Sequence, residues 1–84
     1  MDQKLKEMIA IGASVTANCI PCIRFHFAKA REAGVTDVEI KAAVLVGKMV
    51  RKGAATKWDE EIATLLDEGG SANIQEQSSR CGCN

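Results

Sequence analysis

The sequence predicts an all-α protein of about four short helices that assembles as a homo-oligomer. Apolar residues recur at intervals of three and four over most of residues 1–69, and no convincing strand pattern is present. With 46% hydrophobic and 26% charged residues, the 84-residue chain has the composition of a globular protein. We expect one helical domain over residues 1–69 and a flexible polar tail over residues 70–84.

The first helix is expected from residue 2 to about residue 17, because an apolar row has helical spacing and no proline interrupts it. The row consists of Leu5, Met8, Ile9, Gly12 and Val15. Glu7 lies beside this row. A solvated surface glutamate is its simplest interpretation, since unpaired glutamates are seldom fully buried.

The second helix is expected over residues 20–33, after a break at Asn18 and Cys19. Its main apolar row consists of Ile23, Phe27 and Ala30. Gly34 follows as a good C-terminal cap, because glycine tolerates the positive φ found just beyond many helix ends.

The clearest helix start is a capping box formed by Thr36 and Glu39, with Val35 and Ile40 at the positions of a hydrophobic staple. This helix is expected to continue to about Lys52. It is apolar around most of its circumference, which is typical of a helix buried on several sides. A chain this short could scarcely bury it alone, so we infer subunit packing.

Gly53 is expected to end the third helix, and Thr56 with Asp59 to cap a fourth that reaches Gly69. The apolar face of this fourth helix consists of Trp58, Ile62, Leu65 and Leu66. The aromatic side chains Trp58, Phe25 and Phe27 are most simply core residues. The basic residues Lys41, Lys48, Arg51, Lys52 and Lys57 are most simply a solvated face and an interface rim.

Eleven basic residues balance eleven acidic ones, so no global field attracts nucleic acid or an anionic membrane. The N-terminal residues lack the apolar stretch of a signal peptide, and no run approaches the ~20 apolar residues of a membrane span. We therefore expect a cytoplasmic protein with no nucleic-acid or membrane partner. Thiols in that compartment are kept reduced, which favours a catalytic or metal-binding role for closely spaced cysteines.

The most reactive group of side chains is Cys19-Ile20-Pro21-Cys22, with His26 four residues later. A helix starting near Cys19 would direct its free N–H groups toward the sulfurs, stabilise a thiolate and lower a thiol pKa from the usual ~8.5. Pro21 suits a first helical turn. Residues four apart share a helix face, so Cys22 and His26 would form a nucleophile beside a base.

Other interpretations of these residues stay open. Cys19, Cys22, Cys81 and Cys83 could bind zinc or another soft metal, although the second pair is a CxC on the polar tail. His26 taken alone would more often be an ordinary packed histidine.

Glu7, Cys19, Cys22 and His26 together form the pattern Glu, eleven residues, Cys, two residues, Cys, three residues, His. This pattern and its flanking segments, 18–26 and 33–40, resemble the carboxymuconolactone decarboxylase and AhpD-like alkylhydroperoxidase family. The resemblance covers roughly residues 3–68 and excludes the tail.

The resemblance implies an all-helical domain that forms trimers or hexamers with its thiols near a subunit interface. It also implies that Glu7 belongs to a proton relay with His26 rather than to the surface. In the peroxidase branch, the cysteine matching Cys22 attacks, and the one matching Cys19 supplies a proton and closes the disulfide. The decarboxylase branch generally lacks the cysteine pair, so the resemblance favours thiol redox chemistry.

We therefore expect an enzyme that reduces hydroperoxides or partner disulfides through a redox-active Cys19–Cys22 disulfide, with no other bound cofactor. A dithiol or a peroxiredoxin-type protein would be its redox partner. The alternative is a binding protein that captures a soft metal or metalloid through Cys19, Cys22 and the tail thiols. Cys81 and Cys83 would then either relay electrons to the active-site pair or add soft ligands to it.

Overall fold

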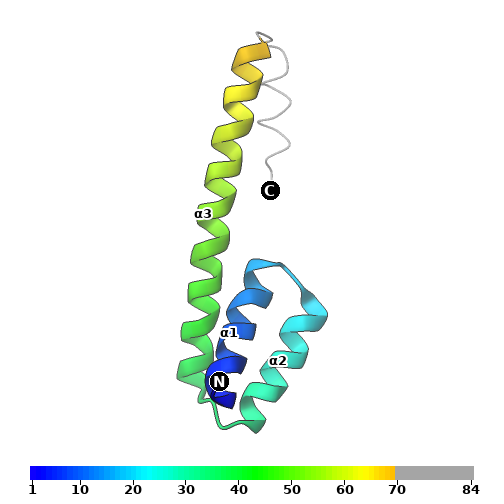
Figure 1. The fold of residues 1–84 in the computed structure, drawn as a ribbon, viewed down its shortest axis with the longest axis vertical. Helices are drawn as coiled ribbons and strands as arrows, with labels where there is room; N and C mark the ends of the chain where they lie inside the picture. Colours follow the sequence, from blue (N-terminus) through cyan, green and yellow to red (C-terminus); the bar gives the residue numbers. More distant parts are fainter. Residues whose placement is uncertain (70–84) are drawn as a thin grey trace. The chain divides into compact units, whose positions relative to one another are not determined.

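The chain folds into three α-helices, as the computed structural model of residues 1–69 shows (Figure 1). They are α1 (Gln3–Thr16), α2 (Ile20–Glu32) and α3 (Asp37–Gly69). The all-α prediction is confirmed for these residues. The expected tail with its two cysteines lies outside them.

The fold divides after Gly53 into two units. The N-terminal unit, Met1–Gly53, holds the core and every predicted site residue of the described chain. The second unit begins at Ala54. In its helical part Trp58 is 68% exposed, so the prediction that this side chain is a core residue is wrong.

The end of α2 confirms the role predicted for Gly34, which adopts a positive φ of 91°. The Gly34 N–H donates to the Arg31 carbonyl at 3.1 Å, and the Val35 N–H donates to the Ala30 carbonyl at 2.9 Å. These two bonds form a Schellman motif, which satisfies carbonyl groups that the end of a helix leaves without partners. The chain is thereby turned directly into the start of α3.

The capping box at the start of α3 is also confirmed. The Thr36 N–H donates to Glu39 Oε1 at 2.9 Å, and the Glu39 N–H donates to Thr36 Oγ1 at 3.2 Å. The hydrogen bond from the Thr36 backbone lowers the pKa of the Glu39 carboxyl, because it stabilises the ionised form. Val35 and Ile40, at the staple positions, are both buried in the core.

The prediction of a helix end at Gly53 and a new start at Thr56 is wrong. The structure has one continuous helix, α3, through both positions, and therefore three helices instead of four within residues 1–69. A glycine inside a helix costs only about 1 kcal/mol relative to alanine. No proline follows Gly53, and helix-favouring residues such as Ala54 flank it.

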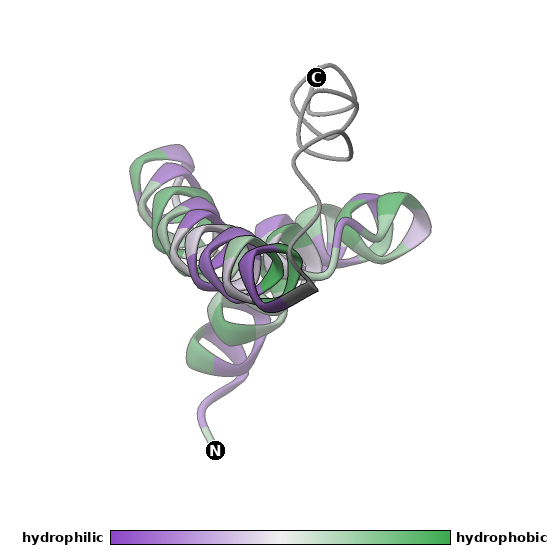
Figure 2. Ribbon diagram, turned by 90° about the horizontal axis from the view of Figure 1, so that it is seen from above, coloured by the Kyte–Doolittle hydropathy of each residue, from purple (hydrophilic) through white to green (hydrophobic). Residues whose placement is uncertain are grey.

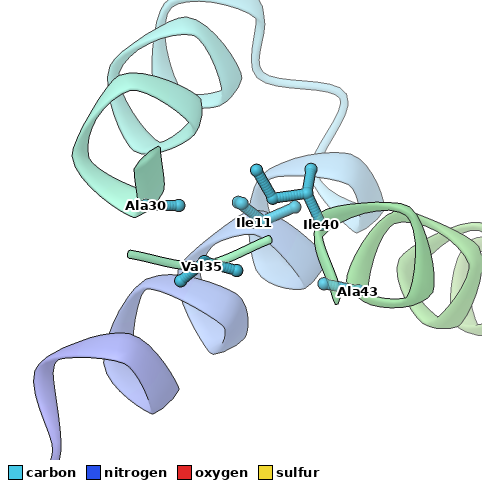
Figure 3. Packing of buried hydrophobic residues seen from close by; sticks show 5 residues of the cluster. All are labelled: Ile11, Ala30, Val35, Ile40 and Ala43. Carbon is cyan, nitrogen blue, oxygen red and sulfur yellow. The ribbon is translucent and has the colours of Figure 1, made fainter. Parts of the chain in front are cut away.

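The core of the N-terminal unit contains one or two residues from each element, and their side chains converge (Figure 3). Its members are Ile11, Ala30, Val35, Ile40 and Ala43. Partly buried side chains pack against it from α1, α2 and α3, namely Met8, Ile23, Phe27 and Val44. The apolar row predicted for α2 therefore does face the core.

The face of α1 that is most deeply buried differs from the predicted apolar row. It carries Glu7, Ile11 and Ser14, whereas Leu5 and Ile9 are about half exposed. Three residues of the predicted row, Met8, Ile9 and Gly12, line a groove beside α3. Backbones approach closely there: a Cβ added to Gly47 would lie 2.6 Å from the Gly12 carbonyl oxygen, so only glycine fits at position 47.

This groove between α1 and the start of α3 is wide and almost wholly apolar. It has a volume of about 480 Å³, and its lining includes Met8, Ile9, Val46 and Val50. Other large apolar side chains of α3 are also exposed, among them Leu45 and Met49. Hydrophobic stretches accordingly alternate with hydrophilic ones along the helices (Figure 2). No helix in the described part of the chain is long and apolar enough to span a membrane.

We propose that the groove and the exposed apolar side chains of α3 at or near it, Leu45, Val46, Met49 and Val50, are covered by other copies of this chain, as a trimer or hexamer. Val46→Glu should then weaken assembly or solubility, because it places a charge in an apolar contact. The matched control is Val38→Glu, since Val38 is 77% exposed at the start of α3 and does not line the groove.

Sedimentation velocity at micromolar concentration measures both effects. We expect an oligomer for wild type and Val38→Glu, and smaller or aggregated species for Val46→Glu. A folded, active wild-type monomer would contradict the proposal.

Candidate functional site

The turn between α1 and α2 is a second Schellman motif, with Asn18 in the position that Gly34 occupies at the end of α2. Asn18 has a φ of 55°, a left-handed conformation that asparagine tolerates better than most residues. Its N–H donates to the Val15 carbonyl, and the Cys19 N–H donates to the Ser14 carbonyl, both at 3.1 Å. Cys19 thus completes the end of α1 and also stands at the N-cap of α2.

Cys19 and Cys22 form a disulfide with their Cα atoms 5.2 Å apart. Cys19 has an extended backbone and accepts the first hydrogen bond of α2, from the Ile23 N–H at 3.0 Å. Pro21 lies in the first turn, as predicted. Both cysteines are partly exposed, so the disulfide lies within reach of solvent at the N-terminus of a helix.

Glu7 and His26 join α1 to α2 by a hydrogen bond of 2.8 Å between Glu7 Oε1 and His26 Nδ1. Glu7 is only 4% exposed, so its interpretation as a solvated surface residue is wrong. An ionised Glu7 has no proton to donate, and with it Nδ1 carries the hydrogen and Nε2 of a neutral imidazole is left as the acceptor. This is the arrangement in which a carboxylate orients a general base.

His26 lies one helical turn after Cys22 on α2, so the structure places a base on the same face as one cysteine. The Phe25 ring stands edge-on to the imidazole, with centroids 5.0 Å apart. Phe25 is 56% exposed, so its assignment to the core is wrong. Its contact with His26 instead covers part of the imidazole.

Arg51 is a further residue of the site, which the sequence analysis placed on a solvated face or interface rim. It is partly buried, and its Nη1 atom donates to the Val15 carbonyl at 3.1 Å and to Asn18 Oδ1 at 2.7 Å. A cation at the C-terminal end of α1 is favourable because the helix dipole is negative there. Arg51 therefore holds the turn that positions Cys19. Arg51 is more than 30 positions from Val15 and Asn18 in the sequence, so no local pattern indicates these contacts.

The described residues contain no group of three His, Cys, Asp or Glu side chains that could hold a metal ion. The four-thiolate site considered above includes Cys81 and Cys83, which lie outside the described residues.

Comparison with known proteins identifies the class. The family model for the carboxymuconolactone decarboxylase family matches residues 1–67, and the chain belongs to this family. A curated relative, "Uncharacterized protein 4 in cox locus" from Paracoccus denitrificans, is 32% identical over 68 residues. The match covers 81% of this chain and 61% of the relative, so the chain spans about three fifths of that protein's length. No solved structure matches the chain significantly.

The geometry of the turn predicts how Asn18 contributes to stability. Asn18→Ala should destabilise the fold by about 2 kcal/mol, because alanine pays roughly 1 kcal/mol for the left-handed backbone and the Arg51 hydrogen bond is lost as well. Asn18→Gly loses only the hydrogen bond and should cost about half as much. Urea unfolding of both variants measures the difference. Equal stability of Asn18→Ala and wild type would contradict the role assigned to this turn.

Proposed function

We propose that this protein is a thiol oxidoreductase that reduces hydroperoxides or partner disulfides through a Cys19–Cys22 dithiol and disulfide cycle. One observation carries the proposal. A buried carboxylate, Glu7, orients His26 on the same helix that begins with the disulfide. A purely structural disulfide has no need of an oriented base beside it.

The reaction starts from the reduced pair. The Cys22 thiolate attacks one oxygen of the peroxide, the O–O bond breaks, and the leaving alkoxide takes a proton to become an alcohol. Cys22 is then a sulfenic acid. The Cys19 thiol attacks the Cys22 sulfur, water leaves, and the disulfide is closed. The disulfide of the structure corresponds to this oxidised end state.

Each described site residue has a separate task in this cycle. The start of α2 stabilises the thiolate, because its free N–H groups carry partial positive charge. His26 takes the proton from Cys22 and can return it to the leaving alkoxide, while Glu7 keeps the imidazole in the required tautomer. Cys19, three residues before Cys22, resolves the intermediate within the same turn.

A dithiol must then reduce the pair to complete the cycle. If the substrate is instead a partner disulfide, such as that of a peroxiredoxin-type protein, Cys22 attacks sulfur in place of oxygen and Cys19 resolves the mixed disulfide.

The family also contains decarboxylases. The presence of both cysteines favours redox chemistry, because lactone decarboxylation requires no cysteine pair.

Substitution of each cysteine tests the proposal. Cys22→Ser should abolish peroxide consumption with a dithiol donor, because it removes the attacking sulfur. Cys19→Ser should leave a sulfenic acid or mixed disulfide on Cys22, which a dimedone-type probe and mass spectrometry detect. Adducts on Cys19 in the Cys22→Ser protein would show that Cys19 is the attacking cysteine and Cys22 the resolving one. Full activity of both variants, or submicromolar soft-metal binding by wild type without turnover, would overturn the proposed function.

The hydrogen-bonded pair gives a second prediction. His26→Ala and Glu7→Gln should each lower the rate, with a loss of about 100-fold for His26→Ala, typical of general-base catalysis. The double variant should be little slower than His26→Ala, because the two residues act as one unit. Steady-state kinetics of the three variants measures this. Wild-type rates for Glu7→Gln, or fully additive losses, would leave Glu7 with a structural role only.

A further inference from the structure

A pocket of about 370 Å³ opens beside the disulfide on the Cys19 side. Apolar walls are provided by Val15, Ile20 and Ile23. Among the described residues, Cys19 lines this pocket and Cys22 does not. A molecule bound in the pocket therefore lies next to Cys19, whereas Cys22 is outside the lining.

Two cations from α3, Lys48 and Arg51, also line the pocket, and none of the described residues that line it is a carboxylate. Arg51 Nη1 is held by two neutral oxygens, Val15 O and Asn18 Oδ1, which leave its charge uncompensated. Lys48 is exposed and forms no ion pair within residues 1–69. The pocket thus combines apolar walls with excess positive charge.

We propose that this pocket is where the thiol reductant enters, and that Lys48 and Arg51 select reductants that carry negative charge on a short apolar chain. A pocket lined by one cysteine of the disulfide and by two cations suits a thiolate, which is itself an anion. A carboxylate elsewhere on the same molecule would add to the attraction. The proposal rests on the proposed function, since it names the electron donor class for the same disulfide.

The chemical step follows from the position of the two sulfurs. The reductant thiolate attacks Cys19 Sγ, a new S–S bond forms between reductant and Cys19, and the Cys19–Cys22 bond breaks. Cys22 leaves as the thiolate, the form that attacks the next substrate. A second thiolate, from the same molecule if it is a dithiol, then attacks the reductant's sulfur and releases Cys19. The reductant is oxidised to a disulfide, and the protein regains both thiols.

Charge-matched small thiols test this directly. The disulfide form of the full chain is mixed with 3-mercaptopropionate, which is anionic, or with cysteamine, which is cationic. The rate of opening is normalised to the thiolate concentration of each reagent and to the rate of that thiolate with a small uncharged disulfide, because a more basic thiolate is intrinsically more nucleophilic. One cation about 6 Å from a unit charge changes such a rate by about threefold even in a water-like dielectric, so reversing the charge of the reagent changes it by about tenfold. We expect 3-mercaptopropionate to react about tenfold faster, with the ratio falling as salt is added.

The variant to compare is Lys48→Gln, because Lys48 supplies charge without holding the turn as Arg51 does. It should lower the preference for the anionic thiol by about threefold or more. Lys41→Gln is the matched control: Lys41 is an exposed lysine of the same helix outside the pocket, and its removal should leave the ratio unchanged. Rapid alkylation and mass mapping should find the mixed disulfide on Cys19 and the alkyl group on Cys22.

Equal normalised rates for the two thiols, an unchanged ratio in Lys48→Gln, or a mixed disulfide on Cys22 would overturn the proposal. The assay contains no peroxide and no partner disulfide, so its outcome is independent of turnover. A charge preference without turnover would refute the proposed function and leave the pocket's selectivity standing. Turnover without a charge preference would refute the pocket's selectivity and leave the proposed function standing.

Discussion

The hydrogen bond between Glu7 and His26 is the interaction on which the rest of the site depends. A carboxylate that is 4% exposed has lost its water and must be compensated by a partner. The partner here is an imidazole on the neighbouring helix, 2.8 Å away. This pair therefore sets how α1 meets α2, and it does so beside a core that has five buried apolar side chains within residues 1–69. Burial of the Glu7 carboxylate in so small a core is a cost that a structural role alone scarcely explains.

The turn between α1 and α2 places the two cysteines at the N-terminus of α2, where a thiolate is stabilised. Asn18 ends α1 in a left-handed conformation, and the next residue, Cys19, is already the N-cap of α2. The disulfide is therefore formed at the helix end where backbone N–H groups are unpaired. Arg51, from α3, holds both Asn18 and the last turn of α1. All three helices of the described chain thus contribute to the placement of one sulfur pair.

The sequence predicted those features that rest on neighbouring residues. The capping box at Thr36, the positive φ of Gly34 and the place of Pro21 each follow from backbone geometry within a few residues, and the structure confirms them. Gly53 was misinterpreted because a glycine costs too little to end a helix whose neighbours favour it. Gly53 does disfavour the helix, but by too little free energy to end it.

Features that depend on distant residues were missed or needed the family pattern. Glu7 has no local sign of burial, and only its spacing from Cys19, Cys22 and His26 pointed to a relay. Arg51 lies in a row of basic residues, and nothing nearby indicates that it contacts Asn18, 33 positions earlier. The buried face of α1 differs from the predicted row, because Ile9 and Gly12 of that row line the groove beside α3 and Leu5 is about half exposed.

The central claim is that Cys19 and Cys22 are the pair that cycles. The most direct measurement treats the fully reduced chain with a hydroperoxide, quenches it at short times by alkylation, and maps every cysteine by mass spectrometry. The account predicts a transient sulfenic acid on Cys22 that is replaced by a Cys19–Cys22 disulfide in step with loss of peroxide. Four thiols that remain free while peroxide persists, or a first linkage that involves Cys81 or Cys83, would contradict it.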